Sequence, residues 1–415
     1  MQFKGGLSAR VAIGFGALAI AAVSAAGADV LVSKGFFTDG VDGVTGLAAV
    51  RQVVVSPDGK NVYTAGEGDS AITVWSRAHD GSLKEIQVLE NGVDGITGIN
   101  FVDNLSVSPD GKNVYAAGIA SQSFVTFARS ASTGELTEVQ VIQNGVDIPA
   151  GLGGVVANAV SSDGKNVYSA ATLDNAVVAF FRNRRTGMLA PIQVIQEGVG
   201  GVTGLKGAFP ITVSRDGKNV YVGGRLDHTV LVFSRGKNGG LTLIQTLTEG
   251  SGGIIGIDGA RAITEAFEGN VVYVAGSVHS TIAVLARNPA DGTLSEIQVI
   301  INHVNATDMA GPTSIVESFD HQHLFVTAFG SFALDSFHRN RRTGKLVGQD
   351  QDTFDPGDGT VNQGLIQIIS AAMSPGGQNL YTVGFFGGNL NVWQIKENSH
   401  EAGTADSAEN ASPED

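Results

Sequence analysis

The octapeptide SPDGKNVY (residues 56–63) decides the fold, because versions of it return along almost the whole chain. It recurs at 108–115, and then as SSDGKNVY (161–168), SRDGKNVY (214–221), AFEGNVVY (266–273), SFDHQHLF (318–325) and SPGGQNLY (374–381). Successive copies are 52, 53, 53, 52, 52 and 56 residues apart, measured at the position of Asp58. Self-similarity at a period of this length is typical of a repeat architecture, so the copies predict seven equivalent units.

Each unit contains four short segments with the pattern of β-strands. In the first unit these are RQVVVS, NVYTAG, AITVWSR and LKEIQVL, separated by turn residues. Short runs rich in Val, Ile, Thr and aromatic residues between such turns indicate antiparallel strands, and Asp58-Gly59 provides a residue suited to positive φ in a tight hairpin. Four strands at this period predict an all-β fold, a seven-bladed β-propeller with four-stranded antiparallel blades.

The two ends of the propeller sequence complete one blade between them. The seventh unit stops after NLNVWQI (389–395), which corresponds to a third strand. The linker ENGVDGITGI (90–99) follows the predicted outer strand of the first unit. The similar linker TDGVDGVTGL (38–47) follows VLVSKGFF (30–37), so VLVSKGFF corresponds to an outer strand. We therefore expect residues 30–37 to pair with 389–395, which closes the ring and removes two exposed strand edges.

Large side chains recur in two slots of the unit, which predicts packing between blades. Burying each ring is worth roughly 1.5–3 kcal/mol, and a sugar-stacking platform is the alternative role. One slot holds Tyr63, Tyr115, Tyr168, Tyr221, Tyr273, Phe325 and Tyr381, and the other holds Trp75, Phe127, Phe180, Phe233, Leu285, Phe337 and Trp393.

The termini fall outside the repeats. Lys4 and Arg10 precede an apolar run that ends in Ala26-Gly27-Ala28, so residues 1–28 are predicted to be a signal peptide and the protein to be exported to a periplasm or outside the cell. Residues 29–396 would form the propeller. Residues 397–415 contain six carboxylates and no Lys or Arg, which predicts a disordered acidic tail.

Composition excludes several classes of function. There is no cysteine, which excludes disulfides and Cys-ligated metals. Removal of Lys4 and Arg10 takes the formal net charge from −14 to −16, and so acidic a chain is not expected to bind nucleic acid or anionic lipid. No segment after the signal peptide is long and apolar enough to span a membrane. The expected partner is a small-molecule ligand or a surface partner, and the expected state is a monomer.

The repeated SPDGKNVY, the strand that ends near Arg77, and the DGSL or TGEL turn together resemble a known family. They are similar to the seven-bladed lactonase-like propellers with YVTN-type repeats, which include a bacterial 6-phosphogluconolactonase. The resemblance covers residues 30–396 and implies a propeller fold with lactone-hydrolysing activity. It implies no particular catalytic residue, since no position here matches a catalytic motif of the family.

Departures from the repeat on one face of the ring give the candidate site residues. At the slot seven residues before the Asp58 position, units one, two and five carry Arg51, Asp103 and Arg261, and four residues further on units five and six carry Glu265 and Glu317. We expect convergence of catalytic and substrate-binding groups there, with the two glutamates interacting so that one pKa rises. The predicted catalytic residues are Glu265, Glu317, His279 and His228, and the predicted substrate-binding residues are Arg225, Arg261, Arg51 and His303. Repeat drift, with the glutamates paired to neighbouring groups, is the alternative.

Metal ions are a second hypothesis, although the sequence demands no cofactor. Asp39, Asp42, Asp94 and Asp147 recur in glycine-rich linkers, and oxygen ligands in loops suit calcium, while Asp beside Gly is also ordinary turn chemistry. His321 and His323 are predicted to be solvent-exposed turn residues on the opposite face. The basic turns RNRRTG (182–187 and 339–344) and RGKNG (235–239) are either solvated or dock an anionic partner.

Two functions remain open at this point. The first is a lactonase-like hydrolase acting on a lactone or related ester. The second is a non-enzymatic binding or scaffold propeller that uses its acidic loop face, with calcium binding as one form of this alternative.

Overall fold

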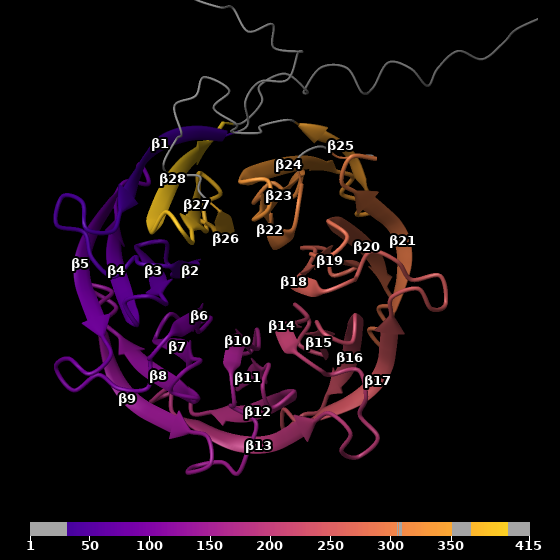
Figure 1. Cartoon of the computed structure of the whole chain (residues 1–415), viewed down its shortest axis with the longest axis horizontal. Coiled ribbons are helices and arrows are strands. Elements are labelled where there is room, and N and C mark those ends of the chain that lie inside the picture. Colours follow the sequence, from indigo (N-terminus) through magenta and orange to yellow (C-terminus); the bar gives the residue numbers. More distant parts are fainter. Residues whose placement is uncertain (1–30, 305, 307–308, 351–366, 397–415) are drawn as a thin grey trace, which may run out of the picture.

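The computed structural model describes residues 31–304, 306, 309–350 and 367–396, and there it shows the predicted propeller. Seven four-stranded antiparallel sheets surround a central channel (Figure 1). The predicted signal peptide and acidic tail lie outside the described residues. Within the described residues no helix long and apolar enough to cross a membrane is found.

Every blade adds strands from the channel outward. The innermost strands are β2 (Val50–Val55), β6 (Val102–Val107), β10 (Val155–Val160), β14 (Ala208–Val213), β18 (Ala260–Glu265), β22 (Pro312–Glu317) and β26 (Ile368–Met373). The second strands are β3 (Asn61–Gly66), β7 (Asn113–Gly118), β11 (Asn166–Ala171), β15 (Asn219–Gly224), β19 (Val271–Gly276), β23 (His323–Ala328) and β27 (Asn379–Gly384). The third strands are β4 (Ala71–Arg77), β8 (Ser123–Arg129), β12 (Ala176–Arg182), β16 (Thr229–Arg235), β20 (Thr281–Arg287), β24 (Ala333–Arg339) and β28 (Asn389–Ile395). The outer strands are β5 (Leu83–Glu90), β9 (Leu136–Gln143), β13 (Leu189–Gln196), β17 (Leu241–Thr248), β21 (Leu294–Ile301), β25 (Leu346–Asp350) and β1 (Leu31–Thr38).

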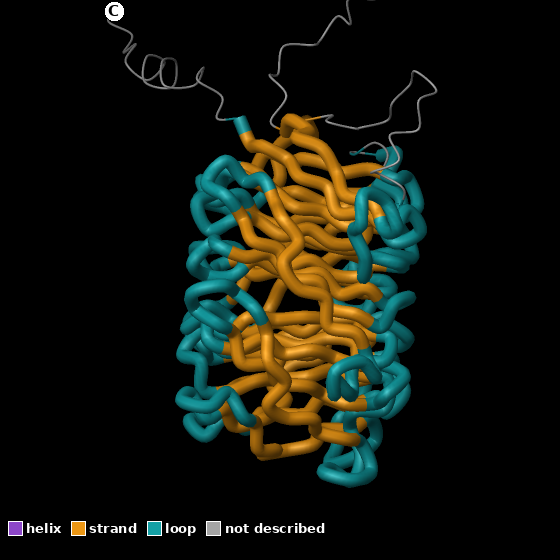
Figure 2. The backbone as a smooth tube through the Cα atoms, turned by 90° about the vertical axis from the view of Figure 1, so that its left-hand side faces the viewer, coloured by secondary structure: helices purple, strands orange, loops and turns teal. Residues whose placement is uncertain are grey.

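The loops gather on two opposite sides of the ring (Figure 2). We call one side the mouth face; it carries the loops between second and third strands and the linkers between blades. The other side, the hairpin face, carries the turns between first and second strands and between third and fourth strands. Antiparallel pairing within each blade fixes this separation. Blades are numbered 1 to 7 in the order of their innermost strands.

The N-terminal strand closes the ring as predicted. β1 pairs antiparallel with β28, in a register that runs from Leu31 opposite Ile395 to Thr38 opposite Asn389. Leu31 is buried at this junction, and the ring of Phe37 lies 4.9 Å from that of Trp75 in blade 1. The same segment therefore completes blade 7 and packs against blade 1.

Deletion of residues 29–37 is expected to destabilise the whole ring. The deletion exposes the edge of β28 and removes apolar contacts, and burial of Leu31 alone is worth about 1.5–3 kcal/mol. Thermal unfolding should therefore show a clearly lower Tm than that of the protein retaining this strand. An unchanged Tm would show that closure by β1 contributes nothing to stability.

Buried arginines clamp neighbouring blades together near the hairpin face. Arg182, the last residue of β12, reaches back to blade 2, where its Nε donates to the Tyr115 hydroxyl at 2.6 Å and its Nη2 to Asn113 Oδ1 at 2.7 Å. The same guanidinium pairs with Asp110 at 2.8 Å. Five other third strands end in an arginine that donates to the tyrosine of the preceding blade: Arg77, Arg129, Arg235, Arg287 and Arg339.

The junction between blades 6 and 7 replaces this clamp by apolar packing. Phe325 occupies the tyrosine slot, and Ile395 occupies the arginine slot at the end of β28. Both lie in one cluster with Leu334, Ile368 and Trp393. The two partners have thus changed together, since a lone arginine facing Phe325 would lose the hydroxyl acceptor. All residues of the two repeated aromatic slots are buried, which confirms their predicted role in packing.

Candidate functional site

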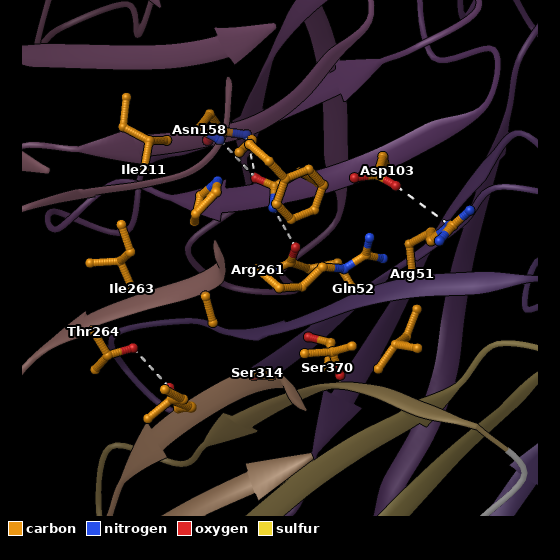
Figure 3. Close-up of a pocket in the computed structure, with 18 of the residues that line it drawn as sticks. Arg51, Gln52, Asp103, Asn158, Ile211, Arg261, Ile263, Thr264, Ser314 and Ser370 are labelled. Carbon is orange, nitrogen blue, oxygen red and sulfur yellow. Dashed lines mark hydrogen bonds and ion pairs between the residues drawn. The ribbon is translucent and has the colours of Figure 1, made fainter. Parts of the chain in front are cut away.

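A cavity of about 220 Å³ lies in the central channel, lined by side chains from the innermost strands of all seven blades (Figure 3). Its charged members are Arg51 on β2, Asp103 on β6 and Arg261 on β18. Each is the second residue of a strand that begins at the mouth face. The charged part of the cavity therefore lies toward the mouth face.

Aromatic rings hold both arginines in place, and carboxylates also contact Arg51. Arg51 contacts Glu67, and its Nε lies 3.5 Å from Asp103 Oδ1. The guanidinium carbon of Arg51 stacks 4.1 Å from the centre of the Phe385 ring, and that of Arg261 stacks 4.9 Å from the centre of the Phe209 ring. Stacking on aromatic faces favours a fixed orientation of each cation.

The buried carboxyl group of Asp103 has a higher pKa than an ordinary aspartate. Burial raises the pKa of Asp103 to about 6, although the positive charges of Arg51 and Arg261 oppose the shift. Burial also lowers the pKa of Arg261 to about 10, and the like charge of Arg225 adds to the effect. A carboxyl group with a pKa near neutrality can both accept and return a proton at physiological pH.

The cavity wall is mainly polar, with apolar side chains among the polar ones. On blades 1 to 3, Asn104 Nδ2 donates to Gln52 Oε1, and Asn158 Nδ2 donates to Asn104 Oδ1 at 2.8 Å. On blades 4 to 6 the wall includes Ile211, Ile263 and Ile315. The cavity thus offers a small molecule fixed polar groups together with some apolar surface, as concave ligand sites do.

The structure brings together only part of the predicted substrate-binding set. Arg51 and Arg261 line the cavity, whereas Arg225 and His303 do not. Arg225 is exposed on the mouth face of blade 4, and its charge reaches Arg261. His303 is exposed in the linker before blade 6, where its backbone N–H donates to the Ala306 carbonyl at 2.7 Å.

His228 and His279, two of the predicted catalytic residues, share one carboxylate on the mouth face. His279 Nδ1 lies 2.8 Å from Asp258 Oδ2, and His228 Nδ1 contacts Asp258 Oδ1. Asp258 is only 6% exposed, while both imidazoles are exposed. The cluster joins the loop of blade 4 to blade 5, and Asp258 orients both rings outside the channel cavity.

Glu265 and Glu317 do not join the mouth-face groups as predicted. Each ends an innermost strand and therefore lies at the hairpin face. Glu265 is four positions after Arg261 in β18, a distance of about 13 Å along the strand. Glu265 pairs with Arg287 at 3.4 Å and accepts the backbone N–H of Arg215. Glu317 pairs with the clamp arginine Arg339 at 2.9 Å and accepts the backbone N–H of Phe267 at 2.8 Å.

The predicted rise in a glutamate pKa has a different cause from the one expected. Burial raises the pKa of both Glu265 and Glu317, with their arginine partners opposing the shift. The pairing found is therefore glutamate with arginine and backbone, which matches the alternative reading of repeat drift.

The prediction of exposed histidines in the blade 6 turn was wrong. His323 is buried at the start of β23, and its backbone N–H donates to Ser318 Oγ at 2.9 Å. His321 is partly buried, because its ring stacks 3.9 Å from that of Phe267 and its Nδ1 lies 3.3 Å from Glu317. The turn is nevertheless on the hairpin face, as expected.

The four aspartates predicted as calcium ligands lie in three mouth-face linkers, with Asp39 and Asp42 together in the first. Asp39 Oδ1 accepts the Leu47 N–H at 3.0 Å, and Asp147 Oδ2 accepts the Gln143 N–H at 2.8 Å. Asp42 and Asp94 are exposed at φ of 51° and 48°. In the described part of the chain no group of three or more His, Asp or Glu side chains is arranged to hold a metal ion. Calcium binding stays a prediction.

Glu67 and Asp258 were not among the predicted site residues. Asp103 was noted only as a departure from the repeat and was given no role. The repeat contained a usable signal for Asp258, since the equivalent linker positions are Ala48, Asn100, Gly153, Lys206 and Ala310. A carboxylate replaces neutral or basic residues only in blade 5. Its contact with His228, 30 residues away on another blade, required the structure.

Comparison with known proteins agrees with this fold. The family model described as lactonase, 7-bladed beta-propeller, matches residues 43–200, 156–298 and 210–363. No curated protein matches the chain in sequence. A solved structure of a periplasmic gluconolactonase from Pseudomonas aeruginosa is similar with a TM-score of 0.60 and 20% identity, covering 77% of this chain and 92% of that one. A putative 6-phosphogluconolactonase from Bacteroides uniformis is similar with a TM-score of 0.57 and 20% identity, covering 71% and 82%. At such identities the neighbours establish the fold alone, and the family match over most of the chain establishes that this protein belongs to the seven-bladed lactonase β-propellers.

Proposed function

We propose that the protein hydrolyses a lactone in the channel cavity, and that it does so after export from the cytoplasm. The observation that carries the proposal is the buried Asp103, with a pKa near 6, facing Arg51 and Arg261 in a small cavity of a lactonase-family propeller. Export rests on the signal-peptide pattern in residues 1–28 and agrees with the periplasmic origin of one structural neighbour.

Asp103 is the group placed to move the proton. Its carboxylate accepts a proton from water as the water oxygen attacks the lactone carbonyl carbon. The Arg261 guanidinium, held on Phe209, stabilises the negative charge that develops on the carbonyl oxygen. When the tetrahedral intermediate collapses, the ring C–O bond breaks and protonated Asp103 returns the proton to the departing oxygen. Arg51 positions Asp103 through their 3.5 Å contact.

Activity should rise with pH through the pKa of Asp103. The carboxylate is the active form, so kcat/KM should increase about tenfold per pH unit well below 6 and level off above it. A pH profile on a lactone that is stable over pH 4.5–8 measures this, with spontaneous hydrolysis subtracted. A profile that is flat across pH 6 would contradict the role of Asp103.

An uncharged lactone is expected to react faster than its phosphorylated form. The mouth-face loops and linkers carry Glu67, Asp69, Asp174, Asp227 and Asp258 against Arg225 and Lys206. This excess of carboxylates repels an anion, and the repulsion weakens with salt. Measured kcat/KM should thus favour gluconolactone over 6-phosphogluconolactone at low salt, with the gap narrowing at high salt. A preference for the phosphorylated lactone that weakens with salt would contradict this.

A non-enzymatic binding propeller is the second candidate, and one observation favours it. Arg51 is already paired with two carboxylates, and the predicted catalytic residues are divided among three places. Under this alternative the cavity binds a neutral ligand without converting it. A panel of lactones and esters separates the two functions, because saturable binding without turnover on any of them would favour the binding protein.

A further inference from the structure

The hairpin face is rich in exposed basic side chains, although the chain as a whole has a negative net charge. Among the described residues in the turns of this face, exposed basic side chains outnumber the exposed carboxylates that lie outside the clamps by eleven to four. The basic residues are Lys60, Lys112, Lys165, Lys218, Arg215, Arg184, Arg185, Lys237, Arg341, Arg342 and Lys345, and the carboxylates are Asp80, Glu135, Asp291 and Asp320.

The clamps are the reason that this charge stays uncompensated. The turns between first and second strands that carry Lys60, Lys112, Lys165 and Lys218 also contain an aspartate, but each of these aspartates is engaged by the clamp arginine of the next blade. The clamp pairs are Asp58 with Arg129, Asp110 with Arg182, Asp163 with Arg235, Asp216 with Arg287 and Glu268 with Arg339. A carboxylate already neutralised by a clamp guanidinium offers little to the lysine beside it, and the two ion pairs of this kind are long, 4.0 Å from Lys165 Nζ to Asp163 and 3.8 Å from Lys218 Nζ to Asp216.

We propose that the hairpin face is a docking surface for the acidic segment 397–415 of the same chain. The segment ENSHEAGTADSAENASPED supplies six carboxylates and no Lys or Arg, so its charge complements that of the face. Electrostatic complementarity of this kind sets the register and orientation of a contact more than its strength. The inference is independent of the proposed lactone site, which lies toward the mouth face.

The described chain ends where such docking requires. The Ile395 N–H donates to the Gln378 carbonyl at 2.9 Å, and Gln378 belongs to the hairpin-face turn of blade 7. Lys396, the last described residue before this segment, therefore lies at this face, in blade 7 between blades 6 and 1. Nineteen residues span at most about 65 Å when extended. A tether this short gives a local concentration in the millimolar range, which makes individually weak ion pairs effective.

Carbodiimide cross-linking of the full chain tests the docking. The reagent activates a carboxylate and joins it to a nearby Lys amine as an amide, taking up the oxygen that leaves as its urea. We expect amide links from the carboxylates of 397–415 to Lys60, Lys345 and Lys112. Their yield should fall about fivefold or more between 20 mM and 0.5 M NaCl because salt screens the contact. Tenfold dilution of the protein should leave the yield unchanged, since the contact is within one molecule.

Lys206 is the internal control, because it is an exposed lysine on the mouth face. Links to Lys206 as abundant as those to the hairpin-face lysines would overturn the proposal, as would links that disappear on dilution. In a second control, replacing Arg341 and Arg342 by Gln should lower the yield at Lys345, whereas Lys206→Gln should not. All three side chains are exposed, so the fold is retained, and lactone turnover gives a separate readout.

Discussion

Asp103→Asn is expected to lower kcat/KM for lactone hydrolysis by about 10²- to 10⁴-fold, the usual contribution of a positioned proton-transfer group. Asn matches Asp in shape but cannot accept the proton of the attacking water. The buried position that raises the Asp103 pKa also makes the replacement mild for folding, since a neutral amide avoids the cost of burying charge. The measurement is steady-state hydrolysis of the best lactone from the panel, above pH 7.

Asp147→Asn is the matched control for this prediction. The chemical change is the same, but Asp147 is exposed in a linker and lies outside the cavity. Its activity should stay within about twofold of the unchanged protein. If Asp103→Asn retains activity within the same range while folding normally, Asp103 is not the proton acceptor.

Arg182→Ala is expected to destabilise the ring by about 3–5 kcal/mol, the range found when one partner of a buried ion pair is removed. The Arg182 side chain is fully buried and joins blade 3 to Asp110, Asn113 and Tyr115 of blade 2. Truncation leaves these polar groups without the donor and opens a cavity between two blades. Urea unfolding followed by tryptophan fluorescence measures the change.

Arg184→Ala separates loss of the clamp from loss of charge. Arg184 is two residues away, exposed on the hairpin face, and its removal should change the free energy of unfolding by less than about 0.5 kcal/mol. Equal effects of the two substitutions would mean that the clamp contributes nothing beyond one positive charge. The apolar junction of Phe325 and Ile395 shows that a seam can also be built without the clamp when both partners change.

The fold could be predicted because its determinants are local and repeated. The SPDGKNVY turn, the alternating strands and the linker first seen at 38–47 recur along the chain. Counting these repeats is enough to predict seven blades. Closure by β1 followed as well, because a unit lacking its outer strand can be completed only by the strand left over at the other end. Both predictions require only the repeat period and no knowledge of side-chain geometry.

The site could be predicted only in part, because the repeat period does not show which side chains of neighbouring blades contact each other. Arg51 and Arg261 shared a slot with Asp103 and were found together, whereas Glu265 was assigned to the wrong end of the channel. Its position immediately before a hairpin turn placed it beside Arg287, at the far end of a strand from the mouth. Net charge misled in a similar way, since a sum over the chain cannot show that basic residues collect on one face.

A crystal structure of the Asp103→Asn protein soaked with a slowly hydrolysed lactone tests the central claim most directly. The claim is that the channel cavity is where the lactone reacts. The lactone should occupy the cavity, with its carbonyl oxygen about 3 Å from the guanidinium of Arg261 and its carbonyl carbon facing residue 103. A lactone bound instead beside His228, Asp258 and His279, with the channel free of ligand, would contradict it.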